Sequence, residues 1–237
     1  MRTYADLHLS PPLDDVANGR SMASLLIEVN TQLVGLVVPP ERTSSTLPVA
    51  DVLKHAGLDV ARRLDLKPKS REELLRGLRT FRSRYEIISV ECRVPSVSTV
   101  AVRDRRVDIV HFPKQKPSNA FRENLAKTCR AALEFNLSEL ISGTSLEMRL
   151  HLLRREIETA VDAGIRVIGS TNASNAFELR SPRDVAAVMH TFGLPLDAAL
   201  QAVSGIPIEM VETNRVRLGG SRLEEGVKVL RRSAKHE

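Results

Sequence analysis

Aromatic residues are scarce in this sequence. Its 237 residues include no tryptophan, two tyrosines and six phenylalanines, so aromatic side chains make up only 3% of the chain. Proteins that bind single-stranded nucleic acid without sequence preference stack successive bases on aromatic rings. The composition therefore argues against such a stacking platform. It leaves open a protein that binds the backbone and shape of folded nucleic acid.

Cysteines and long apolar runs are also few. The two cysteines, Cys92 and Cys129, do not have the spacing of metal ligands, and we expect small buried side chains in a reducing compartment. The most apolar run, residues 33–38, is far too short to span a membrane. Polar residues follow Met1 at once, unlike a signal peptide. We therefore expect a cytoplasmic protein that does not bind a membrane.

Basic residues outnumber acidic ones in the chain. There are 35 lysines and arginines against 29 acidic residues, which gives a net charge of +6, and 27 of the basic residues are arginine. A guanidinium group can donate two parallel hydrogen bonds to a phosphate. The composition fits an anionic partner, although genome composition or adaptation to heat also enriches arginine.

Strand and helix patterns alternate along the chain. Strands joined by helices form parallel units with right-handed crossovers. We therefore predict an α/β fold: a TIM-barrel-like parallel (β/α) barrel with about seven strands and about ten helices. The alternative is an open, doubly wound sheet. The predicted strands are residues 4–9, 33–38, 61–66, 86–92, 107–112, 131–135 and 166–169.

The barrel is predicted to form a single domain over residues 1–215. A segment at 206–211 is the nearest candidate for an eighth strand, but Pro207 and its flanking pattern favour a helix. For residues 216–237 we predict a C-terminal helix and a basic tail, because Leu223, Val227 and Leu230 recur at helical spacing. The alternative for this end is a mobile basic arm that becomes ordered on RNA.

The most informative segment runs from Arg166 to Asp184. A short buried strand is followed by a polar loop, and Ser181, Pro182 and Asp184 then form a well-capped helix start. Arg180 and Arg183 flank this start. A helix N-terminus attracts anions, and arginine is not needed there to stabilise the helix, because acidic residues are the favoured charges in the first turn. We interpret this corner as a phosphate-binding site, with two solvated surface charges as the alternative.

In a (β/α) barrel, functional residues lie on the loops that follow the strands. Those loops carry a basic set, and the only acidic residues we recognise at strand ends are Asp6 and Glu91. The pattern favours binding of a polyanion over acid–base catalysis. The basic set consists of Arg42, Arg93, His111, Lys114 and Lys116, whereas we interpret Arg62, Arg63, Arg154 and Arg155 as solvated charges.

A metal centre needs three or more convergent ligands. Asp6, His8 and His111 are the nearest candidates, and Ser10 stands where a second histidine would complete an H-x-H pair with His8. These residues form at most an incomplete set. We predict no catalytic residue and no metal ligand in this chain.

Four sequence motifs occur in order along the chain. They are Tyr4-Ala-Asp-Leu-His8, Arg106-Val-Asp-Ile-Val110, Ala132-Leu-Glu-Phe135 and, most specific, Phe177-Glu-Leu-Arg-Ser-Pro-Arg-Asp184. Together these motifs resemble the ribonuclease P protein component 3 family, the p30-type subunit of archaeal and eukaryotic ribonuclease P, over roughly residues 3–215. The resemblance implies a TIM-barrel-like fold related to the PHP metallophosphoesterases, without their full metal set.

The resemblance implies a protein subunit of the ribonucleoprotein that removes the 5′ leader of precursor tRNA by endonucleolytic cleavage. In this family the RNA holds the catalytic magnesium, so the protein itself would bind no cofactor. The implied partners are the catalytic RNA, the precursor tRNA, component 2 (the Pop-type subunit) and the other holoenzyme proteins. By motif position, the best candidates for RNA contact are Arg106, Arg180 and Arg183, and the basic loop residues follow.

Two other functions stay open at this point. One is a PHP-type metal-dependent phosphoesterase that uses Asp6, His8 and His111. The other is a small-molecule barrel enzyme that binds an anionic substrate at Arg180 and Arg183.

Overall fold

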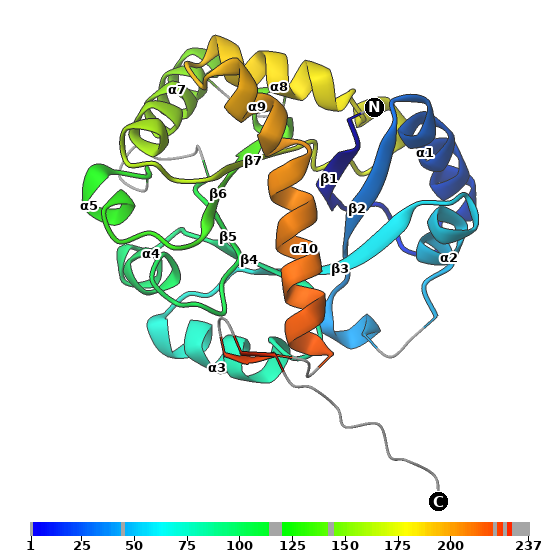
Figure 1. Cartoon of the computed structure of the whole chain (residues 1–237), viewed down its shortest axis with the longest axis horizontal. Helices are drawn as coiled ribbons and strands as arrows, with labels where there is room; N and C mark the ends of the chain where they lie inside the picture. Colours follow the sequence, from blue (N-terminus) through cyan, green and yellow to red (C-terminus); the bar gives the residue numbers. More distant parts are fainter. Residues whose placement is uncertain are drawn as a thin grey trace, which may run out of the picture.

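The computed structural model describes residues 2–43, 46–113, 120–141, 145–219, 222–224 and 227–228. Seven parallel strands follow one another around a nearly closed barrel in the order β1 to β7 (Figure 1). All seven predicted strands are present, with small differences at their ends, and the barrel prediction is confirmed. The strands are β1 Tyr4–Leu9, β2 Thr31–Val37, β3 Asp59–Leu66, β4 Ile87–Glu91, β5 Ile109–His111, β6 Ala132–Asn136 and β7 Val167–Ser170.

Helices cover the outside of the barrel between successive strands (Figure 1). Residues 206–211 belong to the last of these helices, as Pro207 and the flanking pattern predicted. The helices are α1 Val16–Glu28, α2 Pro48–His55, α3 Arg71–Phe81, α4 Pro95–Ala101, α5 Glu123–Ala126, α6 Ser138–Ile141, α7 Leu146–Asp162, α8 Pro182–Thr191, α9 Leu196–Ala202 and α10 Gly205–Leu218, with short 3-10 turns η1 Pro40–Arg42 and η3 Ala176–Glu178.

Local capping explains where several helices begin. The Ser181 hydroxyl accepts a hydrogen bond from the Asp184 amide at 3.1 Å, and the Ser70 hydroxyl accepts one from the Glu73 amide at 3.2 Å. The Ser181 bond is the N-cap bond that the sequence predicts, and Ser70 caps α3 in the same way. Helix α7 differs, because Ser145 precedes it with a φ of 55° and makes no side-chain cap bond. Before the sixth strand, the chain forms only the four-residue helix α5.

Hydrogen bonds close the barrel at both ends of β1, and none of the described residues forms an eighth barrel strand. At the start of β1, the Ala5 amide donates to the Val203 carbonyl at 2.9 Å, just before α10. Beyond its end, the Ser10 amide donates to the Ala173 carbonyl at 2.9 Å, and Leu9 forms an isolated bridge to Ala173. The α9–α10 junction and the loop after β7 therefore fill the gap between β7 and β1.

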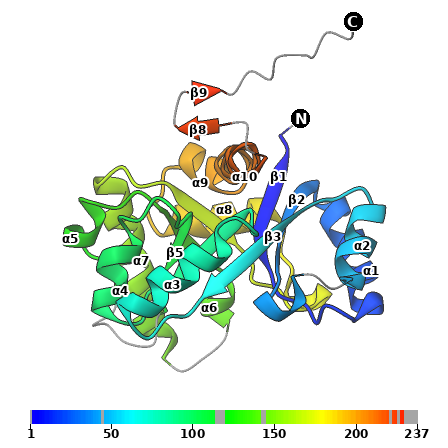
Figure 2. The same ribbon diagram turned by 90° about the horizontal axis from the view of Figure 1, so that it is seen from below.

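The inside of the barrel has an apolar layer at its N-terminal end. Helix α10 lies across that end (Figures 1 and 2), and its Met210 and Val211 pack against the layer. Two residues further along several strands, the same inward face becomes polar, since side chains alternate with a period of two. The apolar layer consists of Ala5, Leu7, Leu33, Ala61, Ile87, Ile109, Ala132 and Ile168.

Within residues 216–237, where we predicted a C-terminal helix and a basic tail, residues 216–218 end α10, and the helix prediction is wrong at 222–224 and 227–228. Arg222–Glu224 and Val227–Lys228 form an antiparallel pair, β8 and β9, beyond α10 (Figure 2). Leu223 and Val227, whose helical spacing led to that prediction, therefore lie in strands, and Leu230 lies outside the described part.

Two smaller expectations concern membranes and cysteines. None of the helices that the structure describes is both long and apolar enough to cross a membrane. Cys92 is buried, as expected, whereas Cys129 is only half-buried, and both are free thiols.

Candidate functional site

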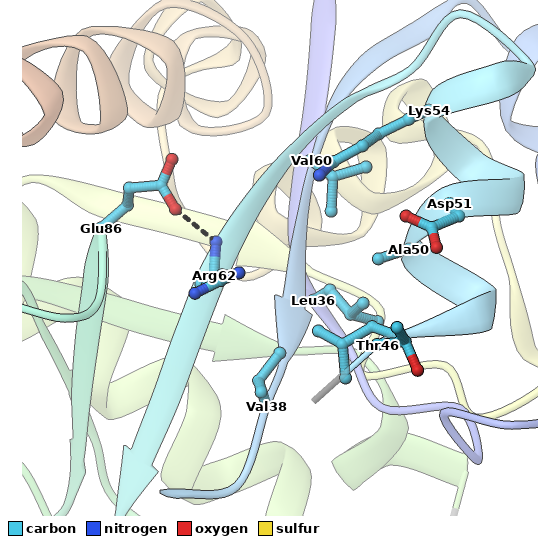
Figure 3. A pocket seen from close by; sticks show the side chains of 10 residues that line it. Leu36, Val38, Thr46, Ala50, Asp51, Lys54, Val60, Arg62 and Glu86 are labelled. Atoms are coloured by element: carbon cyan, nitrogen blue, oxygen red, sulfur yellow. Dashed lines mark hydrogen bonds between the residues drawn. The ribbon is translucent and has the colours of Figure 1, made fainter. Parts of the chain in front are cut away.

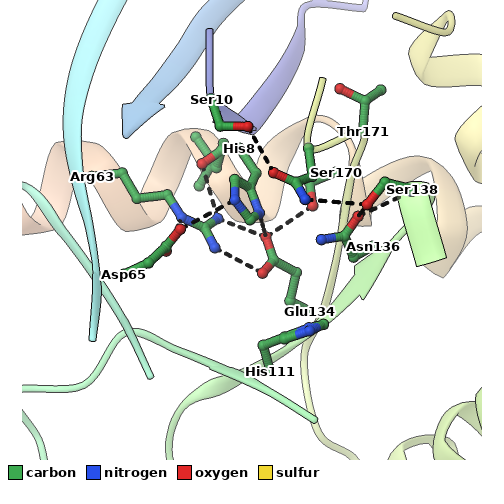
Figure 4. Close-up of polar contacts among 12 residues, drawn as sticks. His8, Ser10, Arg63, Asp65, His111, Glu134, Asn136, Ser138, Ser170 and Thr171 are labelled. Atoms are coloured by element: carbon green, nitrogen blue, oxygen red, sulfur yellow. Dashed lines mark hydrogen bonds and ion pairs between the residues drawn. The ribbon is translucent and has the colours of Figure 1, made fainter. Parts of the chain in front are cut away.

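A buried ion-pair cluster lies at the C-terminal mouth of the barrel (Figure 4). The Arg63 guanidinium donates from Nη1 and Nη2 to the two carboxylate oxygens of Glu134, at 2.6 and 2.8 Å. Its Nε donates to Asp65 Oδ1 at 2.7 Å. Arg63 is only 1% exposed. Two carboxylates therefore hold one guanidinium in the space where the strands of the barrel end.

An irregularity in β1 helps to build this cluster. The pairing of β1 with β2 shifts register between Asp6 and Leu9. The Leu7 carbonyl accepts a hydrogen bond from Arg63 Nη1 at 3.0 Å. A Cβ atom at Gly35, on β2, would lie 2.2 Å from that carbonyl oxygen. Glycine is therefore required at position 35 for β1 to approach so closely.

His8 completes the balance of charge in the cluster. Its Nδ1 lies 3.2 Å from Glu134 Oε1 and its Nε2 lies 3.2 Å from Asp65 Oδ2. Burial and Arg63 lower the pKa of His8, but the attraction of Glu134 and Asp65 outweighs them and raises the pKa to about 9. Near neutral pH, two cations thus face two carboxylates.

The two carboxylates stay ionised in this environment. Burial acts to raise the pKa of Glu134, but Arg63 and His8 hold it well below its usual range. The same two cations lower the pKa of Asp65 against its own burial. The Ser170 hydroxyl donates a further hydrogen bond to Glu134 Oε1 at 2.8 Å. The cluster is therefore a closed set of mutually satisfied groups.

The predicted metal candidates do not come together. Asp6 accepts hydrogen bonds from the amide and hydroxyl of Thr171, whereas His111 contacts Glu139, with Nε2 and Oε1 3.0 Å apart. Within the described ranges, no group of three His, Cys, Asp or Glu side chains is arranged to hold a metal ion. At the mouth, the Arg63 guanidinium already occupies the position between Glu134 and Asp65. These residues do not fit a metal centre.

Our interpretation of the strand ends missed the central residues of this site. Asp6 and Glu91 are not the only acidic residues there, because β3 and β6 also bring Asp65 and Glu134 to the mouth. Arg63 is not a solvated charge. The alternation of side chains along β3 could have identified Arg63 as an inward-facing residue. Ala61, Arg63 and Asp65 lie on the same side of the strand, and Ala61 belongs to the apolar layer inside the barrel.

A cavity of about 540 Å³ opens beside the cluster at the mouth. Charges of both signs line it. Glu91 pairs with Arg93, and its Oε2 lies 3.8 Å from Lys67 Nζ, whereas His111 pairs with Glu139.

A second cavity, of about 310 Å³, lies between α2 and strands β2 and β3 (Figure 3). There the Arg62 amide, on β3, donates to Glu86 Oε2 at 2.7 Å. Both cavities are therefore lined by positive and negative side chains.

Several predicted RNA-contact residues already have carboxylate partners. Arg42, in η1, forms two hydrogen bonds to Asp14, at 2.7 and 2.8 Å. Arg93, after β4, pairs with Glu91. Arg106 lies before β5, at the opposite end of the barrel from the mouth, and pairs with Asp104 at 2.6 Å. His111 pairs with Glu139, and Lys114 and Lys116 lie outside the described residues.

The corner after β7 has a different environment. Arg180 Nη1 donates to the carbonyls of Phe177 and Leu179, both at 2.7 Å. Arg183 Nε donates to the Tyr4 hydroxyl at 2.9 Å, and its guanidinium lies 5.9 Å from the centre of that ring. Neither arginine has a carboxylate partner in the described part of the chain. No carboxylate of the described residues therefore compensates the positive charge of this corner.

Phe177 adds an exposed aromatic ring to the same corner. Phe177 is 91% exposed. An aromatic face beside arginine suits stacking on a nucleobase. We define the β7 corner as Phe177, Arg180 and Arg183.

Comparison with known proteins identifies relatives of the whole chain. The family model described as RNase P subunit p30 matches residues 4–218. A Methanosarcina mazei protein named ribonuclease P protein component 3 is 26% identical over 222 residues, covering 91% of each chain. The protein of the same name from Methanosarcina acetivorans is 28% identical over 179 residues, covering 73% of this chain and 74% of that protein.

A solved structure shares the fold. A chain in the cryo-EM structure of archaeal ribonuclease P with mature tRNA superposes with a TM-score of 0.78 at 20% identity, covering 98% of this chain and 100% of that one. The fold and the family match agree with the motifs that run from Tyr4 to Asp184. The chain therefore belongs to the RNase P subunit p30 family, a family of protein subunits of the endoribonuclease ribonuclease P.

Proposed function

We propose that this chain binds the catalytic RNA of ribonuclease P and supports its active fold, while the RNA supplies the catalytic groups and binds the magnesium. The observation that carries this proposal is the state of the barrel mouth. Arg63, Glu134, Asp65 and His8 satisfy one another there, so no acid, base or nucleophile of the cluster is free to act on a substrate.

The proposed partners follow from the relatives. The Methanosarcina proteins are named as components of ribonuclease P, and the superposed chain comes from a complex with mature tRNA. For this chain we propose the catalytic RNA, the precursor tRNA, component 2 and the other holoenzyme proteins as partners. The cytoplasmic location stays a prediction.

We rank the candidate RNA contacts by their present partners. The β7 corner comes first, because Arg180 and Arg183 bond to carbonyl and hydroxyl groups, and to no carboxylate, among the described residues, and Phe177 offers a stacking face. The residues that already pair with carboxylates would have to exchange an internal partner for a phosphate, which lowers the gain on binding. These residues are Arg42, Arg93, Arg106 and His111; Lys114 and Lys116 stay predictions from loop position alone.

The test of the β7 corner is the salt dependence of RNA binding. The double variant Arg180→Ala/Arg183→Ala should lower the slope of log K against log salt concentration by roughly two, since each lost phosphate contact lowers it by roughly one. The matched control, Arg20→Ala/Arg76→Ala, removes two exposed arginines from α1 and α3. Equal slopes for the double variant and the control would remove this corner from the RNA-binding surface.

A further inference from the structure

A second basic surface lies at the N-terminal end of the barrel, opposite the mouth. The loops that lead into β4, β5, β6 and β7 carry exposed basic residues without any carboxylate partner among the described residues. By contrast, the loops that lead into β1, β2 and β3 contain one basic residue, Arg2. We define the basic arc as Arg84, Arg103, Arg105, Lys127, Arg130 and Arg166.

The sheet order brings these residues together although they span more than 80 positions of the sequence. Strands β4 to β7 are consecutive neighbours, roughly 4.8 Å apart in the hydrogen-bonding direction. The Arg130 amide donates to the Val102 carbonyl at 2.7 Å, and Arg103 Nε donates to the Thr128 hydroxyl at 3.1 Å. The Arg166 carbonyl accepts from the Leu133 amide at 2.9 Å. The four loops therefore form one edge, on the face that Figure 1 views.

The acidic residues of this edge are already engaged. Asp104 binds Arg106, whereas Asp108 binds Arg82 and accepts a hydrogen bond from Asn214 at 2.8 Å. Glu86 pairs with Arg215 of α10 at 2.8 Å. Asp162, Glu209 and Glu212 are exposed on the neighbouring helices α7 and α10 and border the arc. The loops themselves thus present uncompensated positive charge.

The chemistry of the arc favours a phosphate backbone over a protein surface. Five of its six residues are arginine, which suits bidentate contacts to phosphate. Protein interfaces have an apolar or aromatic centre. None of the exposed large apolar side chains lies in the loops 82–86, 102–108, 127–131 or 163–166, although Val161 of α7 and Val216 and Leu218 of α10 are exposed on the bordering helices. We propose that the basic arc docks a second segment of the catalytic RNA, on the opposite end of the barrel from its mouth; this inference rests on the proposed function.

The experiment measures binding of the full chain to the ribonuclease P RNA from the same genome, over a series of salt concentrations. The variant is Arg103→Ala/Arg105→Ala/Arg130→Ala. The control, Arg20→Ala/Lys54→Ala/Arg76→Ala, removes three exposed charges from α1, α2 and α3. We expect the arc variant to lower the log–log slope by roughly two to three and the control to leave it unchanged.

A charge-retaining variant separates charge from folding. Arg103→Lys/Arg105→Lys/Arg130→Lys should keep most of the wild-type slope. Should the alanine triple variant unfold, the single change Arg105→Ala should still lower the slope by roughly one, because the Arg105 side chain makes no hydrogen bond within the described chain.

The outcomes distinguish this inference from the proposed function. Absence of salt-dependent RNA binding by the wild-type chain would contradict the proposed function itself. Normal wild-type binding together with an unchanged slope in the folded arc variant would overturn the inference alone. If the folded arc variant binds RNA normally but no longer binds the component 2 protein, the inference is also overturned, and the arc is assigned to a protein partner.

Discussion

Replacing Glu134 by glutamine tests the buried cluster at the barrel mouth. The substitution keeps the size of the side chain and removes its charge. Arg63 would then stay buried with Asp65 as its one carboxylate partner, since both of its bonds to Glu134 lose their ionic character. Removing one partner of a buried ion pair typically costs about 3–5 kcal/mol. His8 can release its proton and relieve part of the excess positive charge. We therefore expect the free energy of unfolding to fall by about 3 kcal/mol, at the lower end of this range.

The free energy of unfolding in urea measures this loss directly. In a chain of this size, 1 kcal/mol shifts the melting temperature by about 2–4 °C, so the variant should melt about 6–12 °C below the wild type. Glu158→Gln is the control. It removes the carboxylate of an exposed pair with Arg154, at 2.9 Å along α7, and should cost about 0.5 kcal/mol or less.

A small effect would refute the reasoning. If Glu134→Gln costs less than about 1 kcal/mol, the charge of Glu134 is not the partner that Arg63 requires. A double-mutant cycle with Arg63→Met should give a coupling energy of at least about 1 kcal/mol, because the two side chains share two hydrogen bonds.

Further predictions concern pH and backbone approach. The pKa of His8 in the folded protein is raised to about 9, above its ordinary value of 6.5. The contribution of protonated His8 to stability should therefore be complete below about pH 6.5 and lost as the pH rises through 9. The free energy of unfolding in urea at pH 6, 7.5 and 9 should show this decline, and His8→Gln should make the pH dependence flatter. Gly35→Ala should destabilise the protein strongly, because its Cβ would lie 2.2 Å from the Leu7 carbonyl oxygen, whereas Gly77→Ala, where the nearest atom is 3.4 Å away, should leave stability unchanged or raise it by up to about 1 kcal/mol. Thermal melting of the two glycine variants checks this contrast, and equal effects would argue against the tight approach of β1 to β2.

The sequence predicted the features that depend on near neighbours. All seven strands and the Ser181 cap follow from patterns within a few residues. The partners of Arg63 were not predictable in this way, because Glu134 lies 71 positions away and arginine is seldom buried. The carboxylate that pairs with Arg42 also became visible only in three dimensions, because Asp14 lies 28 positions away.

The basic arc also could not be predicted from near neighbours in the sequence. Its six residues come from four loops that are separated by whole helices, and only the order of strands β4 to β7 makes them neighbours. Arg106 was singled out by its motif, and the structure locates it among these loops, paired with Asp104. Helical spacing misled the prediction for the C-terminal end, because Leu223 and Val227 fit both a helix and the strands that form there.

The central claim is that the RNA, and not this polypeptide, cleaves the substrate. The most direct measurement is cleavage of precursor tRNA by the purified chain, alone and after addition of the ribonuclease P RNA with component 2, across a magnesium series. We predict no cleavage by the chain alone and cleavage at lower magnesium once RNA and both proteins are combined. Magnesium-dependent cleavage by the chain alone, abolished by Asp6→Ala, would contradict the account.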